Sequence, residues 1–135
     1  MKLLVWIIAG LLVASFGLTV AEAKPKQNTD KEIILAYADA HGIPRNVINY
    51  VAKRESGFRC SPGNPRYKGP LQVSPGSARA LGYKSAEGPL NNCRAGLKYG
   101  MRHLKLCVNK VGANPKRAAH CHAMPAKYGV HVVWK

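Results

Sequence analysis

Acidic residues are scarce in this 135-residue chain: six aspartates and glutamates stand against 21 lysines and arginines, which gives a net charge of +15. A surface of that sign attracts polyanions, namely nucleic acid, anionic lipid or a cell wall that bears carboxylates and phosphates. No recognisable nucleic-acid-binding motif is present, and the basic residues are scattered rather than interleaved with aromatics. We therefore expect no nucleic acid as a partner. The basic residues also do not concentrate on one amphipathic helix, which disfavours a membrane-disrupting role.

The sequence also lacks internal repeats and any sustained alternation of apolar and polar residues. Apolar residues recur instead at helical spacing, so the pattern predicts an all-α fold. The expected helices begin at a Thr29–Glu32 capping box, at Pro44, at Ser74 and Pro75, at Asn91 as N-cap, and at about Lys116. Residues 57–73 form a long loop in this prediction, and residues 130–134 form a short strand or a packed tail.

The N-terminal segment has the pattern of an export signal. Lys2 supplies the positive charge, residues 3–20 form an apolar run, and Ala-Glu-Ala at residues 21–23 is a small-x-small cleavage site. An uncleaved membrane anchor is the alternative that the length of the run leaves open. Removal of 23 residues leaves a flexible leader at 24–28 and a single domain at 29–135. We expect the protein in the periplasm or outside the cell.

Four cysteines in a small exported domain predict two disulfides. Three pairings are open, and we favour Cys60 with Cys93 and Cys107 with Cys121. The first would tie the long loop to the next helix, and the second would join neighbouring helices. Each bridge would contribute about 2–4 kcal/mol to the stability of so small a core.

A metal centre is the competing interpretation of the same cysteines. His103 lies one helical turn before Cys107, and residues 120–122 read His-Cys-His. Three adjacent residues do not converge easily on one tetrahedral ion, and no regular zinc spacing is present. We therefore expect neither a metal nor another cofactor.

Glu55 is a carboxylate at a position where a helix should bury carbon. The helix that Pro44 opens at its first position ends before Gly57, and Glu55 continues its apolar stripe. The stripe consists of Val47, Ile48, Val51 and Ala52. Loss of hydration there raises a carboxyl pKa toward the range of a general acid. The alternative is a half-exposed helix-end glutamate paired with one of the bases Lys53, Arg54 and Arg59.

Four short segments share the order and spacing of one family's motifs. They read Glu-Ser-Gly at 55–57, Gly-Pro-Leu-Gln at 69–72, Ala-Leu-Gly at 80–82 and Asn-x-x-x-Gly at 92–96. Together they resemble the lytic transglycosylase domain of the soluble lytic transglycosylase family, in the lysozyme-like superfamily. The resemblance spans roughly residues 32–128. It implies a small lysozyme-like helical domain with long active-site loops, which the disulfides would staple.

The resemblance implies cleavage of peptidoglycan glycan strands between N-acetylmuramic acid and N-acetylglucosamine. Glu55 matches the family's catalytic acid, which protonates the bridging oxygen and then takes a proton from the C6 hydroxyl, giving a 1,6-anhydro product. The alternatives are a hydrolytic muramidase on the same fold and a non-catalytic cationic wall-binding protein. We expect a monomer whose substrate is the glycan strand, with wall opening for an envelope-spanning assembly as one role.

Further site residues follow from matching positions in the family. Ser56 and Gln72 would bind substrate or hold Glu55, Leu71 would line the saccharide cleft, and Asn92 would open the last matching motif. The chain departs from the family where Pro70 and Leu71 replace Leu-Met.

A second departure lies in the last helix. Cys121 takes the place of a tyrosine that should face the catalytic glutamate. His120, His122 or Tyr128 would then substitute for that tyrosine, or other groups would orient Glu55. His122 and Tyr128 are therefore included among the expected substrate-binding residues.

The shortage of acids supports a one-carboxylate scheme independently of the family. Most glycosidases use two carboxyl groups that flank the bond. The other acids of the domain, which fall at a helix start, a helix end or in a loop, are Asp30, Glu32, Asp39 and Glu87. A nucleophilic hydroxyl already held beside the reacting carbon makes a second acid dispensable.

Overall fold

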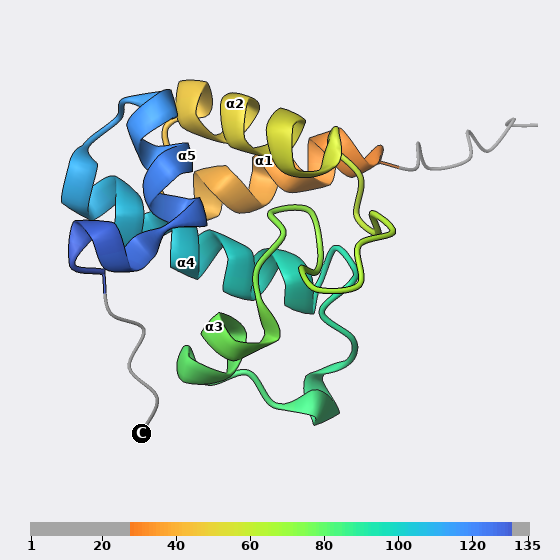
Figure 1. Ribbon diagram of the computed structural model, residues 1–135. Helices are drawn as coiled ribbons and strands as arrows, with labels where there is room; N and C mark the ends of the chain where they lie inside the picture. Colours follow the sequence, from red (N-terminus) through yellow and green to blue (C-terminus); the bar gives the residue numbers. More distant parts are fainter. Residues whose placement is uncertain (1–27, 131–135) are drawn as a thin grey trace, which may run out of the picture.

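The computed structural model describes residues 28–130. In that range the chain is all-α: five α-helices and two 3₁₀ turns, with one isolated β-bridge between Lys68 and Val73 and no strand (Figure 1). The helices are α1 (Asp30–Ala40), α2 (Arg45–Ser56), α3 (Pro75–Ala80), α4 (Ala95–Val111) and α5 (Pro115–Ala123), and the 3₁₀ turns are η1 (Ser85–Glu87) and η2 (Pro125–Tyr128).

Several sequence predictions concern residues outside this range. The export signal at 1–23, nearly all of the leader at 24–28 and the tail beyond residue 130 lie outside the described residues. Between residues 28 and 130, no helix is long and apolar enough to span a bilayer.

The predicted capping box opens α1. The Thr29 hydroxyl accepts the Glu32 backbone N–H at 3.3 Å, and the Glu32 carboxylate accepts the Thr29 N–H at 2.8 Å. Without the capping box, the two backbone N–H groups would have no partner within the helix, as is usual at a helix N-terminus. At the end of α2, Gly57 adopts the left-handed conformation (φ +61°) that stops the helix.

Two predicted helix starts need correction. Pro44 is the N-cap of α2 and not its first residue, because its backbone is extended (ψ 139°) while its carbonyl accepts the Val47 and Ile48 N–H groups. Asn91 does not cap α4, which begins at Ala95. Its side chain accepts the Gly69 N–H instead, so a long-range contact with the loop takes the place of the local cap.

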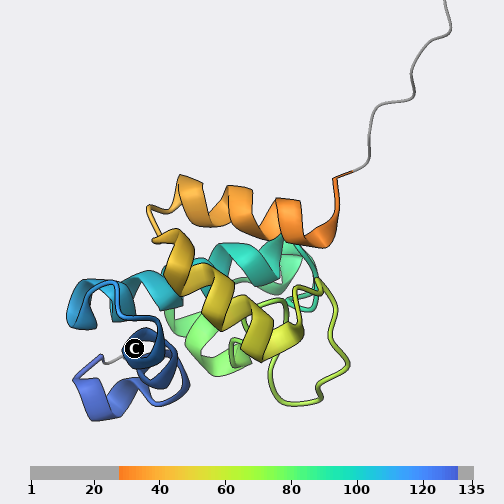
Figure 2. The same ribbon diagram turned by 90° about the horizontal axis from the view of Figure 1, so that it is seen from above.

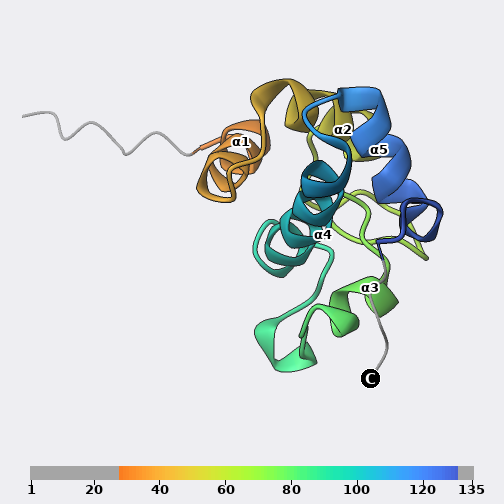
Figure 3. The same ribbon diagram turned by 90° about the vertical axis from the view of Figure 1, so that its left-hand side faces the viewer.

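Helix α4 is the centre of the fold. Figures 1 and 3 show it between α1 and α2 on one side and α3 with η1 on the other, and Figure 2 shows α1 and α2 side by side above it. Its buried Leu97, Met101 and Leu104 join the apolar faces of α1, α2 and α5 in the main core. A smaller cluster around the other face contains Val73, Ala78, Leu90, Ala95 and Tyr99.

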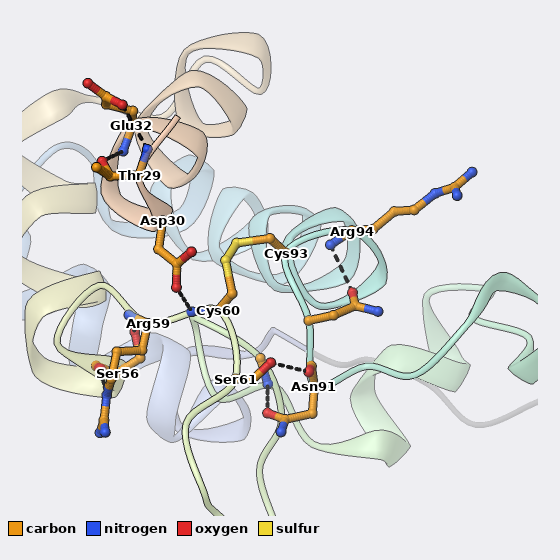
Figure 4. Close-up of a disulfide and its surroundings, with 12 residues drawn as sticks. Thr29, Asp30, Glu32, Ser56, Arg59, Cys60, Ser61, Asn91, Cys93 and Arg94 are labelled. Atoms are coloured by element: carbon orange, nitrogen blue, oxygen red, sulfur yellow. Dashed lines mark hydrogen bonds between the residues drawn. A yellow bond between two sulfur atoms is a disulfide. The ribbon is translucent and has the colours of Figure 1, made fainter. Parts of the chain in front are cut away.

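The structure confirms both favoured disulfides. Cys60–Cys93 (Cα–Cα 4.8 Å) ties the long loop to the residues just before α4, and Cys107–Cys121 (5.6 Å) joins α4 to α5. Figure 4 shows the first bridge, where the Asp30 carboxylate also accepts the Cys60 N–H at 2.8 Å. With Cys107 and Cys121 bonded to each other, neither offers a thiolate, so the competing zinc site is wrong for these residues.

Close backbone approach seats the loop 69–72 on α4. A Cβ on Gly96 would collide with the Leu90 carbonyl oxygen and lie 3.0 Å from the Gly69 Cα. One turn later, a Cβ on Gly100 would lie 3.0 Å from the Leu71 Cβ. The two helix glycines therefore form a groove that admits the loop backbone, and this contact fixes where Gln72 emerges.

We expect Gly96→Ala to lower the free energy of unfolding by about 1–3 kcal/mol, despite the better helix propensity of alanine, because the loop must shift away from α4. Gly63→Ala is the matched control, since a Cβ there meets nothing within 4 Å. Urea unfolding followed by circular dichroism measures both. Equal stability of the two variants would contradict the tight seating of the loop.

Candidate functional site

Glu55 lies in the last turn of α2 at the edge of a pocket of about 460 Å³. Its side chain is 19% exposed, which agrees with a position at the end of a buried stripe. The walls come from the end of α2, the segment between Asn64 and Ser77, one residue of α4, and the end of α5 with the start of η2. The lining residues are Glu55, Asn64, Tyr67, Gln72, Val73, Ser74, Ser77, His103, His122, Ala123 and Pro125.

Burial dominates the electrostatics of Glu55. Loss of hydration raises the pKa of its carboxyl group, and the positive charge of Arg54 opposes this increase. The Arg54 Nε lies 3.7 Å from Oε1, but the Arg54 side chain is half exposed, so water screens the attraction. Glu55 thus has both features that the sequence suggested, a partly buried carboxyl group and a basic neighbour at the helix end. The raised pKa shows that burial affects the carboxyl group more than Arg54 does.

The other acids of the described part of the chain are engaged elsewhere. Asp39 pairs with Arg45 on the surface, Asp30 accepts the Cys60 N–H, and Glu32 belongs to the α1 capping box. Glu87 accepts hydrogen bonds from Lys98 and Tyr99, both at 2.6 Å, which lower its pKa to about 2. Between residues 28 and 130, Glu55 is therefore the sole acid that lines the pocket.

The loop 69–72 brings Gln72 and Leu71 to opposite sides of one backbone. Gln72 adopts a positive φ of 49°, unusual for a residue other than glycine, and lines the pocket while its Nε2 donates to the Gly69 carbonyl at 2.9 Å. Leu71 points the other way and is fully buried in the core. Leu71 therefore does not line the pocket as predicted, whereas Gln72 does.

Ser56, Asn92 and Tyr128 also lie outside the pocket lining. The Ser56 hydroxyl is buried and donates to the Ala52 carbonyl, which ties it to its own helix. Asn92 accepts the Arg94 and Ala95 N–H groups at the start of α4. Both side chains therefore form hydrogen bonds with nearby backbone groups and stabilise the local backbone conformation.

Of the three residues predicted as substitutes for the family's tyrosine, His122 lines the pocket, whereas His120 and Tyr128 do not. The Tyr128 hydroxyl and the His120 Nδ1 lie 2.7 Å apart, and neither residue lines the pocket. Cys121 is buried in its disulfide. Of the predicted site residues, the structure thus gathers Glu55, Gln72 and His122.

A hydrogen-bonded histidine pair closes the pocket between α4 and α5. The His122 Nε2 lies 2.7 Å from the Leu71 carbonyl oxygen, which can only accept, so this nitrogen carries the proton. Nδ1 of the neutral ring is then an acceptor, and the His103 Nδ1, 2.9 Å away, donates to it. The Leu71 carbonyl thereby fixes the tautomers of both rings, and the His103 Nε2 is left unprotonated.

Burial lowers the pKa of both histidines, and His122 lowers that of His103 further, to about 3. The His103 Nε2 is buried and has no hydrogen-bond partner among residues 28–130. An unpaired buried acceptor lowers the stability of the fold by about 1–3 kcal/mol, so the histidine pair adds little to that stability. Because both rings line the same pocket as Glu55, the pair belongs to the candidate site.

Sequence reasoning treated His103 only as a potential metal ligand. The available signal was its place on the inward face of α4, one turn before the buried Cys107. Asn64 and Tyr67 were missed as well, because an irregular loop has no periodicity from which to predict which side chains face a cavity. Ser74 and Ser77, at the start of α3, were also missed, because a six-residue helix is too short for its pattern to indicate which face lies toward a cavity.

The histidine pair predicts a loss of stability in mild acid. The unfolded chain binds protons on these rings below a pKa of about 6.5, whereas the folded protein does so only at much lower pH. The free energy of unfolding is therefore highest, with respect to these rings, above pH 6.5 and falls progressively as the pH decreases, for His103 toward about pH 3. Urea unfolding at pH 7, 6 and 5 measures this slope above the range in which most carboxylates titrate.

The matched comparison is between buried and exposed histidines. The double variant His103→Leu/His122→Leu should flatten the slope between pH 7 and 5, and His120→Gln, at an exposed position, should leave it unchanged. An unaltered slope in the double variant would show that the pair is not held neutral in the folded protein.

Comparison of the chain with models of known families, with curated proteins and with solved structures yields no match. The chemistry of the pocket is therefore the guide to its function. One carboxyl with a raised pKa can give and take a single proton, while the amide, hydroxyl and imidazole groups around it can bind an uncharged polar ligand.

Proposed function

We propose that the chain is an exported lytic transglycosylase of lysozyme-like fold, which cleaves peptidoglycan with Glu55 as its single acid and base. The observation that carries the proposal is the position of Glu55: a half-buried carboxyl with a raised pKa, and the sole acid lining the pocket within the described residues. The family motifs at residues 55–57, 69–72, 80–82 and 92–96 supply the substrate class.

The reaction needs one proton donor that becomes a proton acceptor. Protonated Glu55 donates to the glycosidic oxygen as the bond from that oxygen to C1 of N-acetylmuramic acid breaks. The Glu55 carboxylate then takes the proton of the C6 hydroxyl, and O6 forms a bond to C1. The products are a 1,6-anhydro end and a free N-acetylglucosamine end, and Glu55 returns to its protonated state.

The absence of a second acid from the described pocket favours this route over hydrolysis. A hydrolytic glycosidase generally uses a second carboxylate to activate water or to attack C1. The other acids between residues 28 and 130, namely Asp30, Glu32, Asp39 and Glu87, are held by the contacts described above. An internal hydroxyl nucleophile replaces that function because it is already positioned beside C1.

The polar groups of the pocket support a saccharide ligand. Asn64, Gln72, Ser74 and Ser77 offer amide and hydroxyl groups that can exchange hydrogen bonds with sugar hydroxyl and acetamido groups. The net charge of +15 would hold the protein on a wall rich in carboxylates and phosphates. Two disulfides fit an exported protein, which we propose acts as a monomer in local wall opening, for example at an envelope-spanning assembly.

We expect Glu55→Gln to reduce the release of soluble fragments from purified peptidoglycan at least about 100-fold, because the described pocket loses its sole carboxyl group, the proposed proton donor and acceptor. Asp39→Asn is the matched control: it also removes one carboxylate, but from an exposed surface ion pair. Chromatography and mass spectrometry of the released muropeptides measure both rates.

Stability provides the second control. The raised pKa means that the charged Glu55 destabilises the fold at neutral pH, so Glu55→Gln should unfold at a temperature no lower than the unmodified protein. Unchanged fragment release by Glu55→Gln would reject Glu55 as the catalytic acid. If neither protein releases fragments and both bind the wall tightly, the chain is a cationic wall-binding module.

A further inference from the structure

Tyr67 is an exposed aromatic residue inside the candidate site. Its side chain is 48% exposed although it lines the pocket. The other large apolar side chains that are comparably exposed in residues 28–130, namely Tyr50, Leu106 and Met124, do not line it. Of these four residues, Tyr67 is thus the one that lines the same pocket as Glu55.

The backbone around Tyr67 is held by several contacts. The Asn64 side-chain oxygen accepts the Arg66 and Tyr67 N–H groups at 2.9 and 3.0 Å. The Lys68 ammonium donates to the Asn64 carbonyl at 3.0 Å, and Lys68 and Val73 exchange both backbone hydrogen bonds at 3.0 Å. The ring is therefore presented from a fixed turn and not from a free loop.

The Cys60–Cys93 bridge and the Asn91 side chain anchor the same segment on either side of this turn. Cys60 is covalently tied to the residues before α4, and Asn91 accepts the Gly69 N–H at 3.3 Å. An aromatic ring whose backbone is fixed before binding loses little conformational freedom when a ligand arrives. Its exposed area is then available for contact.

We propose that Tyr67 is a saccharide-stacking residue of the pocket, which packs its ring face against the C–H face of one sugar of the glycan strand. The proposal rests on the proposed function and adds a residue that determines sugar binding. Neighbouring Asn64, Gln72 and Ser77 would bind hydroxyl and acetamido groups at the edge of that sugar. A pyranose ring has this division, with axial C–H groups on its faces and polar groups around its edge.

The stacking contact comes from the ring and not from the hydroxyl. The Tyr67 hydroxyl forms no hydrogen bond within the described part of the chain, so its removal leaves the local structure unchanged. Tyr67→Phe should therefore keep the contact, and Tyr67→Ala should remove it. Tyr50→Ala is the matched control, because Tyr50 is 39% exposed on α2 away from the pocket.

Binding is measured on the Glu55→Gln protein, in which no turnover interferes, with the trimer of N-acetylglucosamine as probe and calorimetry or NMR titration as readout. Loss of an aromatic contact should weaken binding about tenfold in Tyr67→Ala. Tyr67→Phe and Tyr50→Ala should remain within about twofold of the parent, which is the level of a change that removes no contact. In the active protein, Tyr67→Ala should raise KM for peptidoglycan more than it lowers kcat.

Each outcome of these binding measurements supports or overturns the stacking role of Tyr67. Parent-like binding by Tyr67→Ala, or equal losses in Tyr67→Ala and Tyr67→Phe, would overturn the stacking role while leaving the Glu55 chemistry untouched. Failure of the Glu55→Gln parent to bind the trimer would also overturn it. Loss of helical circular dichroism in Tyr67→Ala would move the comparison to Tyr67→Leu, which retains an apolar side chain without a ring and should bind as weakly as expected for alanine.

Discussion

The seating of the loop 69–72 on α4 is the contact on which the candidate site depends. Gly96 and Gly100 open a groove on the helix: the Gly69 backbone lies against Gly96, and the Leu71 side chain lies against Gly100. The Leu71 carbonyl accepts a hydrogen bond from the His122 Nε2. The same short backbone thereby links the core, the α4–α5 histidine pair and Gln72. Because Gln72 emerges with a positive φ, the surrounding contacts must hold it in a conformation that the residue does not prefer by itself.

Glu55 reaches the pocket from the end of α2 for a different reason. The apolar stripe of α2 places it against the core, and Gly57 ends the helix before another turn can cover it. Its carboxyl group is consequently buried enough for a raised pKa and open enough to line a cavity. Scarcity of acids elsewhere in the pocket then gives this group both proton-transfer roles in the proposed reaction.

Much of this arrangement could be predicted from local sequence. The capping box of α1 and the stripe and terminal glycine of α2 follow from spacing. The presence of two disulfides follows from the four cysteines of an exported domain, but the sequence left three pairings open, and the structure confirms the favoured one. The start of α4 could not, because Asn91 forms a hydrogen bond with Gly69, 22 residues away. His103 and Tyr67 were missed as site residues for different reasons. The packing of α4 against α5 places His103 beside His122, and an irregular turn places Tyr67 in the pocket lining. The lysozyme-like fold and the activity remain proposals that rest on the motifs and the pocket.

The central claim is that one carboxylate suffices because the substrate supplies its own nucleophile. Digestion of peptidoglycan in water enriched in oxygen-18, followed by mass spectrometry of the muramic acid ends, tests it most directly. The account predicts 1,6-anhydro ends that contain no oxygen-18, since O6 closes onto C1 and water takes no part. Reducing ends that carry one oxygen-18 would show that water attacks C1, which would contradict the single-acid transglycosylase and identify a hydrolase.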